Sequence, residues 1–242
     1  MKKFPVLEIF GPTVQGEGMV VGQKTMFVRT AGCDYSCSWC DSAFTWDGSG
    51  KDDIEQMTSE QIWEELRKIG GNSFGHVTIS GGNPALLTHL NELIDLLHEK
   101  GVKVAIETQG SRWQEWFVDI DDLTISPKPP SSTMNTNFGM LDEILEKLQV
   151  ADRFKNVSLK VVVFDDKDLE YATEVHQRYP HIPFFVQVGN EDLQEADSTK
   201  LMQQLIKKYE WLIDQTMASE KLVNVRVLPQ LHTFVWGNKR GV

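Results

Sequence analysis

The chain contains three cysteines, Cys33, Cys37 and Cys40, and all of them fall within eight residues in the spacing C-x3-C-x2-C. Apolar packing gives no reason for such a cluster, and an odd number of thiols cannot all be paired as disulfides within one chain. Three thiolates that converge from one loop can hold a soft metal ion or an iron–sulfur cluster. A cluster of four irons held by three protein sulfurs leaves one iron open to a substrate or a second cofactor.

A zinc site is the structural alternative for the same three cysteines. Zinc in a closed structural site prefers four ligands, and the fourth would have to come from a distant part of the chain, since the nearest histidine in sequence is His76. A zinc-stabilised binding module without catalysis therefore stays open at this point, although the spacing favours it less than an iron–sulfur cluster.

Composition limits the class of protein. With 242 residues, 40% hydrophobic content and 24% charged content, the chain can form one large α/β domain, spanning residues 1–242, with a substantial core. The net charge of −11 argues against a nucleic-acid surface, which needs clustered Lys and Arg. No apolar run is long enough to span a membrane, and no signal peptide is recognisable, so a reducing cytoplasm is expected.

Short strand-like runs alternate with amphipathic segments along the chain. The runs are rich in β-branched and aromatic residues and predict strands at 24–30, 76–80, 102–107, 123–126, 157–163, 183–188 and 223–228. Helices are predicted from a capping box at Thr58 and Gln61 to Gly70-Gly71, and at 86–100, 140–148, 169–178 and 201–217. This alternation predicts an α/β fold whose sheet curls into a partial, incomplete TIM-like barrel of about six parallel strands.

The unusual polar residues come directly after the predicted strands. Cys33 follows the first run, Gly81-Gly82-Asn83-Pro84 the second, Glu107-Thr108-Gln109-Gly110 the third and Ser126-Pro127-Lys128 the fourth. Because the carboxyl ends of parallel strands meet at one side of the sheet, these four loops are expected to surround one ligand-binding mouth.

The cysteine spacing, placed after the first strand of the predicted barrel, resembles the radical SAM superfamily. Nearly the whole chain is similar to the 7-carboxy-7-deazaguanine synthase (QueE) family of queuosine biosynthesis, in the form found in Bacillus-like bacteria. Besides the cysteine loop, the resemblance is carried by Val14-Gln15-Gly16-Glu17-Gly18, Arg29, Gly81-Gly82-Asn83-Pro84, Glu107-Thr108 and Ser126-Pro127-Lys128.

This resemblance implies a carbon–nitrogen lyase with a radical SAM core. Such an enzyme converts 6-carboxy-5,6,7,8-tetrahydropterin to 7-carboxy-7-deazaguanine with loss of ammonia, and it uses a [4Fe–4S] cluster, S-adenosylmethionine (SAM) and Mg2+. One electron from the cluster cleaves the sulfonium of SAM, and the resulting 5′-deoxyadenosyl radical removes hydrogen from C6 of the substrate. The hydrogen later returns to the adenosyl group, so SAM acts catalytically.

The resemblance also implies roles for individual residues. The cluster ligands are Cys33, Cys37 and Cys40, and Ser42 is a ligand of Mg2+. The expected SAM contacts are Trp39, Asp41, Gly82, Glu107, Thr108, Ser126 and Lys128. The expected substrate contacts are Val14, Gln15, Gly16, Glu17, Arg29, Ser80 and His232.

Several of these residues also have ordinary structural interpretations. Asn83 stands where the superfamily usually has Glu, and Gly-Gly-Asn-Pro would serve equally as a plain turn between strand and helix. Ser42 and Lys128 are equally compatible with solvated loop positions. His232 is as compatible with packing as with a site, and the acids at 165, 166 and 168 are interpreted as a solvated turn.

The family also implies a homodimer and an electron donor of the flavodoxin or ferredoxin type. A radical SAM activating enzyme that acts on a partner protein is the alternative function. Such enzymes lack the Gln-Gly-Glu-Gly loop at 15–18, so its presence here favours the pterin substrate.

Overall fold

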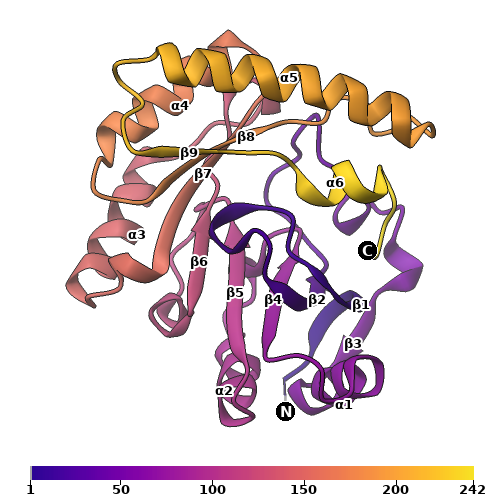
Figure 1. The fold of residues 1–242 in the computed structure, drawn as a ribbon. Coiled ribbons are helices and arrows are strands. Elements are labelled where there is room, and N and C mark those ends of the chain that lie inside the picture. The colour runs from indigo at the N-terminus through magenta and orange to yellow at the C-terminus, as the bar shows by residue number, and fades with distance from the viewer. Residues whose placement is uncertain (1) are drawn as a thin grey trace.

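The computed structural model describes residues 2–242 and forms one nine-stranded sheet in the order β3-β1-β2-β4-β5-β6-β7-β8-β9 (Figure 1). Seven neighbouring strands run parallel to one another. They are β2 (Lys24–Thr30), β4 (His76–Gly81), β5 (Lys103–Thr108), β6 (Asp122–Ile125), β7 (Val157–Val163), β8 (Phe184–Val188) and β9 (Val225–Leu228).

The predicted strands are all present, and the expectation of an incomplete barrel is confirmed. The sheet is open, because β3 and β9 form its two edges and do not pair with each other. The parallel set contains seven strands, in agreement with the prediction of about six, and the predicted strand at 223–228 forms its last member, β9, beside β8. The central strands β7 and β8 are buried on both faces, which explains their nearly continuous apolar sequences.

Two antiparallel strands at one edge are absent from the sequence prediction. β1 (Phe4–Val14) pairs with β2, and the short β3 (Glu55–Met57) pairs with β1. The register of β1 shifts between Phe10 and Thr13, where Gly11 and Pro12 interrupt the pattern. A strand irregularity accommodates these residues, which otherwise indicate a loop.

The helices cover the outer side of the curved sheet. They are α1 (Ser59–Gly70), α2 (Asn91–Glu99), α3 (Phe138–Val150), α4 (Asp166–Arg178) and α5 (Ser198–Ala218), and a short α6 (Leu231–Trp236) lies at the open side (Figure 1). The capping box predicted at Thr58 and Gln61 is confirmed. The helix predicted at 86–100 is shorter, because a 3-10 turn at Pro84–Leu86 precedes α2.

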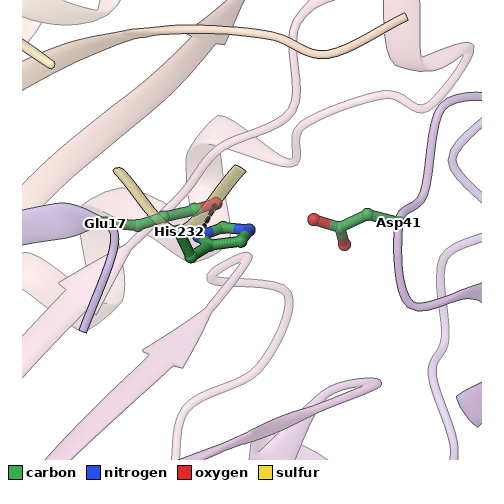
Figure 2. Close-up of side chains that lie close together, drawn as sticks. All are labelled: Glu17, Asp41 and His232. Atoms are coloured by element: carbon green, nitrogen blue, oxygen red, sulfur yellow. Dashed lines mark ion pairs between the residues drawn. The ribbon is translucent and has the colours of Figure 1, made fainter. Parts of the chain in front are cut away.

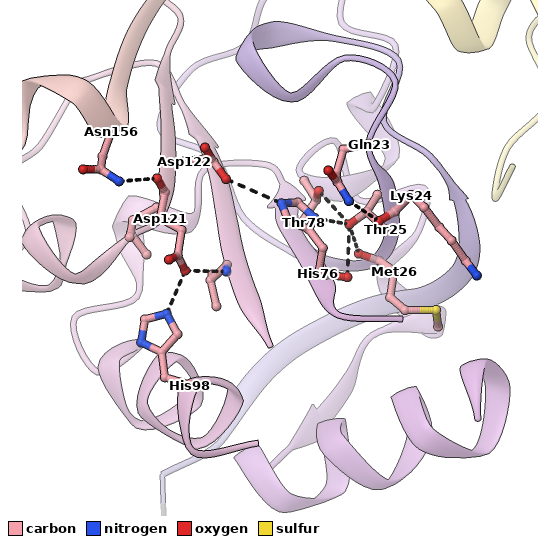
Figure 3. Close-up of polar contacts among 12 residues, drawn as sticks. Gln23, Lys24, Thr25, Met26, His76, Thr78, His98, Asp121, Asp122 and Asn156 are labelled. Carbon is pink, nitrogen blue, oxygen red and sulfur yellow. Dashed lines mark hydrogen bonds and ion pairs between the residues drawn. The ribbon is translucent and has the colours of Figure 1, made fainter. Parts of the chain in front are cut away.

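Polar residues tie the amino ends of the strands together, on the side away from the predicted mouth (Figure 3). His76 Nδ1 lies 2.8 Å from Thr25 Oγ1, which lies 3.1 Å from Thr78 Oγ1. The Asp121 carboxylate bonds His98 Nε2 at 2.9 Å and a backbone N–H of β5 at 2.9 Å. These bonds link neighbouring strands at their amino ends and help to fix their alignment, so this end of the sheet contributes stability and leaves the other end for ligands.

None of the helices in the described part of the chain is long and apolar enough to cross a lipid bilayer.

Candidate active site

A cavity of about 480 Å3 opens at the carboxyl ends of the parallel strands. The loops after β2, β4, β5 and β6 border it, as their sequences predicted, and the loop after β1 and the segment around α6 close its remaining side. Every residue predicted for the site lines this cavity except Ser126. Ser126 is buried beside it, and its hydroxyl oxygen lies 3.2 Å from Lys128 Nζ, which does face the cavity.

The cysteine loop leaves β2 and is fixed by its neighbours through the backbone. Gly32 N–H donates to the carbonyl of Thr45 at 2.8 Å, and the Gly32 carbonyl accepts from Asn83 N–H at 2.8 Å. Gly82 lies against this turn so closely that a Cβ there would stand 2.0 Å from the Gly32 carbonyl oxygen. Only glycine fits at position 82, so the turn after β4 and the cysteine loop are built against each other.

All three cysteines are free thiols that line the cavity, and N–H groups point at two of the sulfurs. Cys33 Sγ accepts from Tyr35 N–H at 3.4 Å and from Gln109 Nε2 at 3.6 Å, and Cys40 Sγ accepts from Trp46 Nε1 at 3.4 Å. Donors aimed at sulfur stabilise thiolate ligands and tune iron–sulfur clusters.

Burial raises the pKa of Cys37 to about 11, and burial also raises the pKa values of Cys33 and Cys40. Such thiols are weak nucleophiles at neutral pH, and a metal that displaces their protons reverses this effect. The donor set therefore suits a metal cluster better than covalent catalysis by a thiol.

The spacing of the sulfurs argues against one small ion held by the three cysteines. Within residues 2–242, the one set of three His, Cys, Asp or Glu ligand atoms that lie within 4.8 Å of one another is Glu17, Asp41 and His232. The three cysteine sulfurs do not form such a set in the described residues, which is compatible with a cluster that provides a separate iron for each sulfur.

A segment after β6 holds the cysteine loop from the other side. Ser38 Oγ donates to the Ser131 carbonyl at 2.7 Å, and Trp39 Nε1 donates to Ser131 Oγ at 2.9 Å. Asp168 in turn anchors this segment, because its carboxylate accepts from Ser131 N–H and Phe164 N–H, each at 3.0 Å. The interpretation of residues 165, 166 and 168 as a solvated turn is thus wrong for Asp168, which is fully buried near the start of α4.

Asn83 has a structural role in the turn after β4. Its side-chain oxygen accepts from Thr108 Oγ1 at 2.8 Å and from Ala85 N–H at 3.1 Å, and its amide nitrogen donates to Asp34 at 2.9 Å. The neutral amide supplies both a donor and acceptors, which a carboxylate could not do. Asn83 therefore links the ends of β4 and β5 to the cysteine loop.

Arg29 projects into the cavity from near the end of β2. Its Nε lies 2.6 Å from Glu8 Oε1, and its guanidinium lies over the rings of Phe10 and Phe44, at 5.6 and 5.5 Å from their centres. Arginine held at Nε and stacked on its faces keeps its terminal nitrogens in a fixed plane. Such a fork is suited to bind a carboxylate.

Lys160 lies between Glu17 and Glu107, although its sequence context gives little sign of a site. It stands in the middle of β7, its side chain is 1% exposed, and it forms ion pairs with both carboxylates. Lys160 is not predicted as a site residue from the sequence, because a single lysine in a strand is ordinarily solvated. The available signal was its position inside the apolar run VSLKVVV, where burial would demand acidic partners.

The residues around His232 bring the last strand and helix onto the first loop. Leu231 N–H donates to the Gly16 carbonyl at 3.1 Å, and Gln230 Nε2 donates to Glu17 Oε1 at 2.9 Å. His232 Nδ1 lies 4.0 Å from Glu17 Oε1, and Figure 2 shows Asp41 reaching toward the same ring from the cysteine loop. His232 thus lies in the wall of the cavity, one of the two positions that its sequence left open.

Comparisons with known proteins agree with this arrangement. A family model described as the radical SAM superfamily matches residues 27–184. Proteins named 7-carboxy-7-deazaguanine synthase from Bacillus cereus and Bacillus subtilis are 64% and 65% identical to this chain. The first alignment covers 100% of both proteins, and the second covers 100% of this chain and 99% of its relative.

Solved structures share the fold of this chain. The crystal structure of QueE from Escherichia coli matches with a TM-score of 0.65 and 26% identity, covering 95% of each chain. The crystal structure of Streptococcus suis SuiB, at 17% identity and a TM-score of 0.57, shares the fold over 85% of this chain and 49% of its own. The chain therefore belongs to the radical SAM superfamily and, within it, to the 7-carboxy-7-deazaguanine synthase family.

Proposed function

We propose that this protein converts 6-carboxy-5,6,7,8-tetrahydropterin to 7-carboxy-7-deazaguanine and ammonia, as a step of queuosine biosynthesis. The observation that carries the proposal is one cavity that holds the three free cysteines on one side and Arg29, Glu17 and His232 on another. Substrate and product differ by one ammonia, so the reaction needs no net oxidant or reductant.

Membership of the superfamily implies a [4Fe–4S] cluster and SAM, and the residues present fit both. Three separate sulfurs with N–H donors suit the cluster. The turn at Gly81-Gly82 offers close backbone approach, and Lys128 and Trp39 lie on the same side of the cavity. When bound, the cluster and SAM supply one-electron cleavage of a sulfonium bond and hence a carbon-centred radical.

The chain's own residues bind the substrate, orient it and exclude water. The Arg29 fork is placed to hold the substrate carboxylate, and the side chains of Gln15 and Glu17 offer acceptors to the N–H groups of the pterin ring. The Ser80 hydroxyl is buried at the cavity without a partner among the described residues, so a bound ligand would satisfy it. These contacts would fix C6 of the substrate near the radical source.

Mg2+ is proposed to bind at Ser42 between the cysteine loop and the substrate carboxylate. Ser42 Oγ lies 2.8 Å from Asp41 Oδ1, so two oxygen atoms of the kind that Mg2+ prefers meet at the cavity wall. Dependence of turnover on added Mg2+ after chelation, and its weakening in Ser42→Ala, would support this assignment.

The electron is proposed to come from a flavodoxin or ferredoxin in the cytoplasm, and the enzyme is proposed to act as a homodimer. The chain has only three cysteines, so it cannot hold a second cluster with cysteine ligands that would relay electrons internally. A reducing compartment also keeps the three thiols available for iron.

Anaerobic reconstitution and turnover test the proposed function. We expect a brown protein with about four iron and four sulfide per chain. With SAM and reductant it should release ammonia and a deazapurine from carboxytetrahydropterin, and Cys37→Ser should lose both cluster and activity. A colourless protein with one zinc would indicate a binding module, and a cluster-loaded protein inactive on the pterin would indicate another radical SAM substrate.

A further inference from the structure

Lys160 is a buried cation shared by two carboxylates from distant parts of the chain. Its Nζ lies 2.5 Å from Glu17 Oε2, and it also contacts Glu107 Oε1. A lysine that is 1% exposed is costly to charge unless acidic partners compensate, and this one has two. Glu17, Lys160 and Glu107 therefore form one ion-pair group in which a single ammonium serves two carboxylates.

The two carboxylates border different parts of the cavity. Glu17 stands beside Gln230 and His232, on the side proposed for the substrate. Glu107 is the last but one residue of β5, next to Thr108, whose hydroxyl donates to Asn83 in the turn proposed to receive SAM. Lys160, which also lines the cavity, lies at the boundary between the two sides.

We propose that Lys160 is a positioning residue that couples the substrate side of the cavity to the SAM side by holding Glu17 and Glu107 as fixed, charged hydrogen-bond acceptors. The inference rests on the proposed function, which supplies the two ligands. Because one ammonium orients both carboxylates, a ligand that bonds to one of them further restricts the ammonium and so helps to hold the other carboxylate in place. Substrate and SAM should therefore bind cooperatively, and the coupling should pass through this side chain.

The surroundings of Glu17 leave it little freedom. Oε1 accepts from Gln230 Nε2 and faces His232 Nδ1 at 4.0 Å, and Oε2 is held by Lys160. The Asp41 carboxylate also lies within 4.8 Å of the ligand atoms of Glu17 and His232. Burial alone would raise the pKa of Glu17, but Lys160 and then His232 outweigh it, so its pKa lies well below the ordinary range. Glu17 thus stays a pure acceptor, matched to N–H groups of a ligand.

The test is ligand binding to the cluster-loaded enzyme without reductant, so that no turnover occurs. Calorimetry would measure the affinity for SAM and for carboxytetrahydropterin, each alone and with the other present. For Lys160→Met we expect substrate affinity to fall roughly tenfold to a hundredfold and the mutual enhancement to disappear. Lys103→Met is the matched control, because Lys103 is an exposed lysine on β5, the strand that also carries Glu107.

The pH dependence separates positioning from general damage. In the wild type, Glu17 remains charged at acidic pH, so its protonation does not reduce substrate affinity as the pH is lowered. Without Lys160, Glu17 loses the largest influence that lowers its pKa, so its pKa rises and substrate affinity should fall more steeply toward acidic pH than in the wild type. Loss of packing alone would weaken binding equally at every pH.

A second variant covers the case in which Lys160→Met is too unstable to study. Lys160→Met/Glu17→Gln removes one uncompensated buried carboxylate, so we expect it to recover thermal stability but not substrate binding. Wild-type affinities, coupling and pH profile in Lys160→Met would overturn the inference while the proposed function stands. A wild-type enzyme that does not bind or convert the pterin would overturn both.

Discussion

At the scale of single residues, the site depends on charged side chains whose orientation is set by neighbours. Arg29 is held at Nε by Glu8 and sandwiched by Phe10 and Phe44, and Glu8 is itself bonded by Arg240 Nε at 2.8 Å. The guanidinium is therefore in place before a ligand arrives. Preorganised groups of this kind lose little entropy on binding.

Replacement of Arg29 by alanine should weaken carboxytetrahydropterin binding and leave the cluster intact. A charge-assisted hydrogen bond of this kind contributes about 1.5–3 kcal/mol, so the dissociation constant should rise roughly tenfold to a hundredfold. Calorimetry and iron analysis of the same preparation measure the two effects. Arg67→Ala, at an exposed position on α1 beside Trp63, is the control, and unchanged affinity in Arg29→Ala would remove Arg29 from the site.

At the scale of elements, the start of α4 supports the cysteine loop without touching it. The Asp168 carboxylate fixes Ser131 and Phe164 through their N–H groups, and Ser131 holds Ser38 and Trp39. A helix on the outer side of the sheet thus sets the position of the loop that presents the sulfurs. This chain of contacts connects packing on one side of the sheet with chemistry on the other.

Replacement of Asp168 by asparagine should reduce both stability and cluster retention. One amide oxygen cannot accept from two N–H groups held on opposite sides of the carboxylate, and a buried donor left unsatisfied costs about 1–3 kcal/mol. Thermal unfolding and the iron content after a fixed time in chelator measure the effects. Asp166→Asn, at an exposed position in the same turn, should match the wild type, and equal iron loss in both variants would contradict the role of Asp168.

Some elements of the fold could be predicted from their own sequence and others could not. The parallel strands and the mouth at their carboxyl ends could be predicted, because buried strands and strand-end loops have local sequence signals. β1 could not, since Pro5, Gly11 and Pro12 favour a loop until β2 is available for pairing. The ion pair of Lys160 with Glu17 could not be predicted, because Glu17 lies 143 residues away and a local sequence pattern carries no information about so distant a contact.

At the scale of the whole molecule, the cavity is completed by segments from opposite ends of the sequence. Gly16 and the backbone around His232 pack so closely that a Cβ at position 16 would stand 2.4 Å from His232 Nδ1 and 2.8 Å from His232 N. The absence of a side chain at Gly16 is therefore what permits α6 to reach the first loop. The substrate side of the cavity depends on this close approach.

Replacement of Gly16 by alanine should displace α6, with a loss of stability of about 1–3 kcal/mol and weaker substrate binding. Cluster content should not change, because the cysteine loop is held by other contacts. Gly139→Ala is the matched control, since its Cβ would meet only Asn137 Oδ1 at 3.4 Å in α3 and should raise stability by about 0.5–1 kcal/mol. Thermal unfolding, iron analysis and calorimetry measure stability, cluster content and substrate affinity in turn. A fully active Gly16→Ala enzyme would contradict the proposal that the substrate side of the cavity depends on the close approach of α6.

The bond between Glu17 and Gln230 joins residues 213 positions apart, and this separation has a consequence during synthesis. At about 5–20 residues per second, a ribosome needs roughly ten to forty seconds to add the intervening residues. From the synthesis of Cys40 until that of Gln230, which is most of that interval, the nascent polypeptide contains the three thiols but not the segment that closes the cavity. If the cluster were inserted during this period, the cysteine loop would still be exposed to solvent. The structure therefore favours insertion of the iron–sulfur cluster after Gln230 has been synthesised.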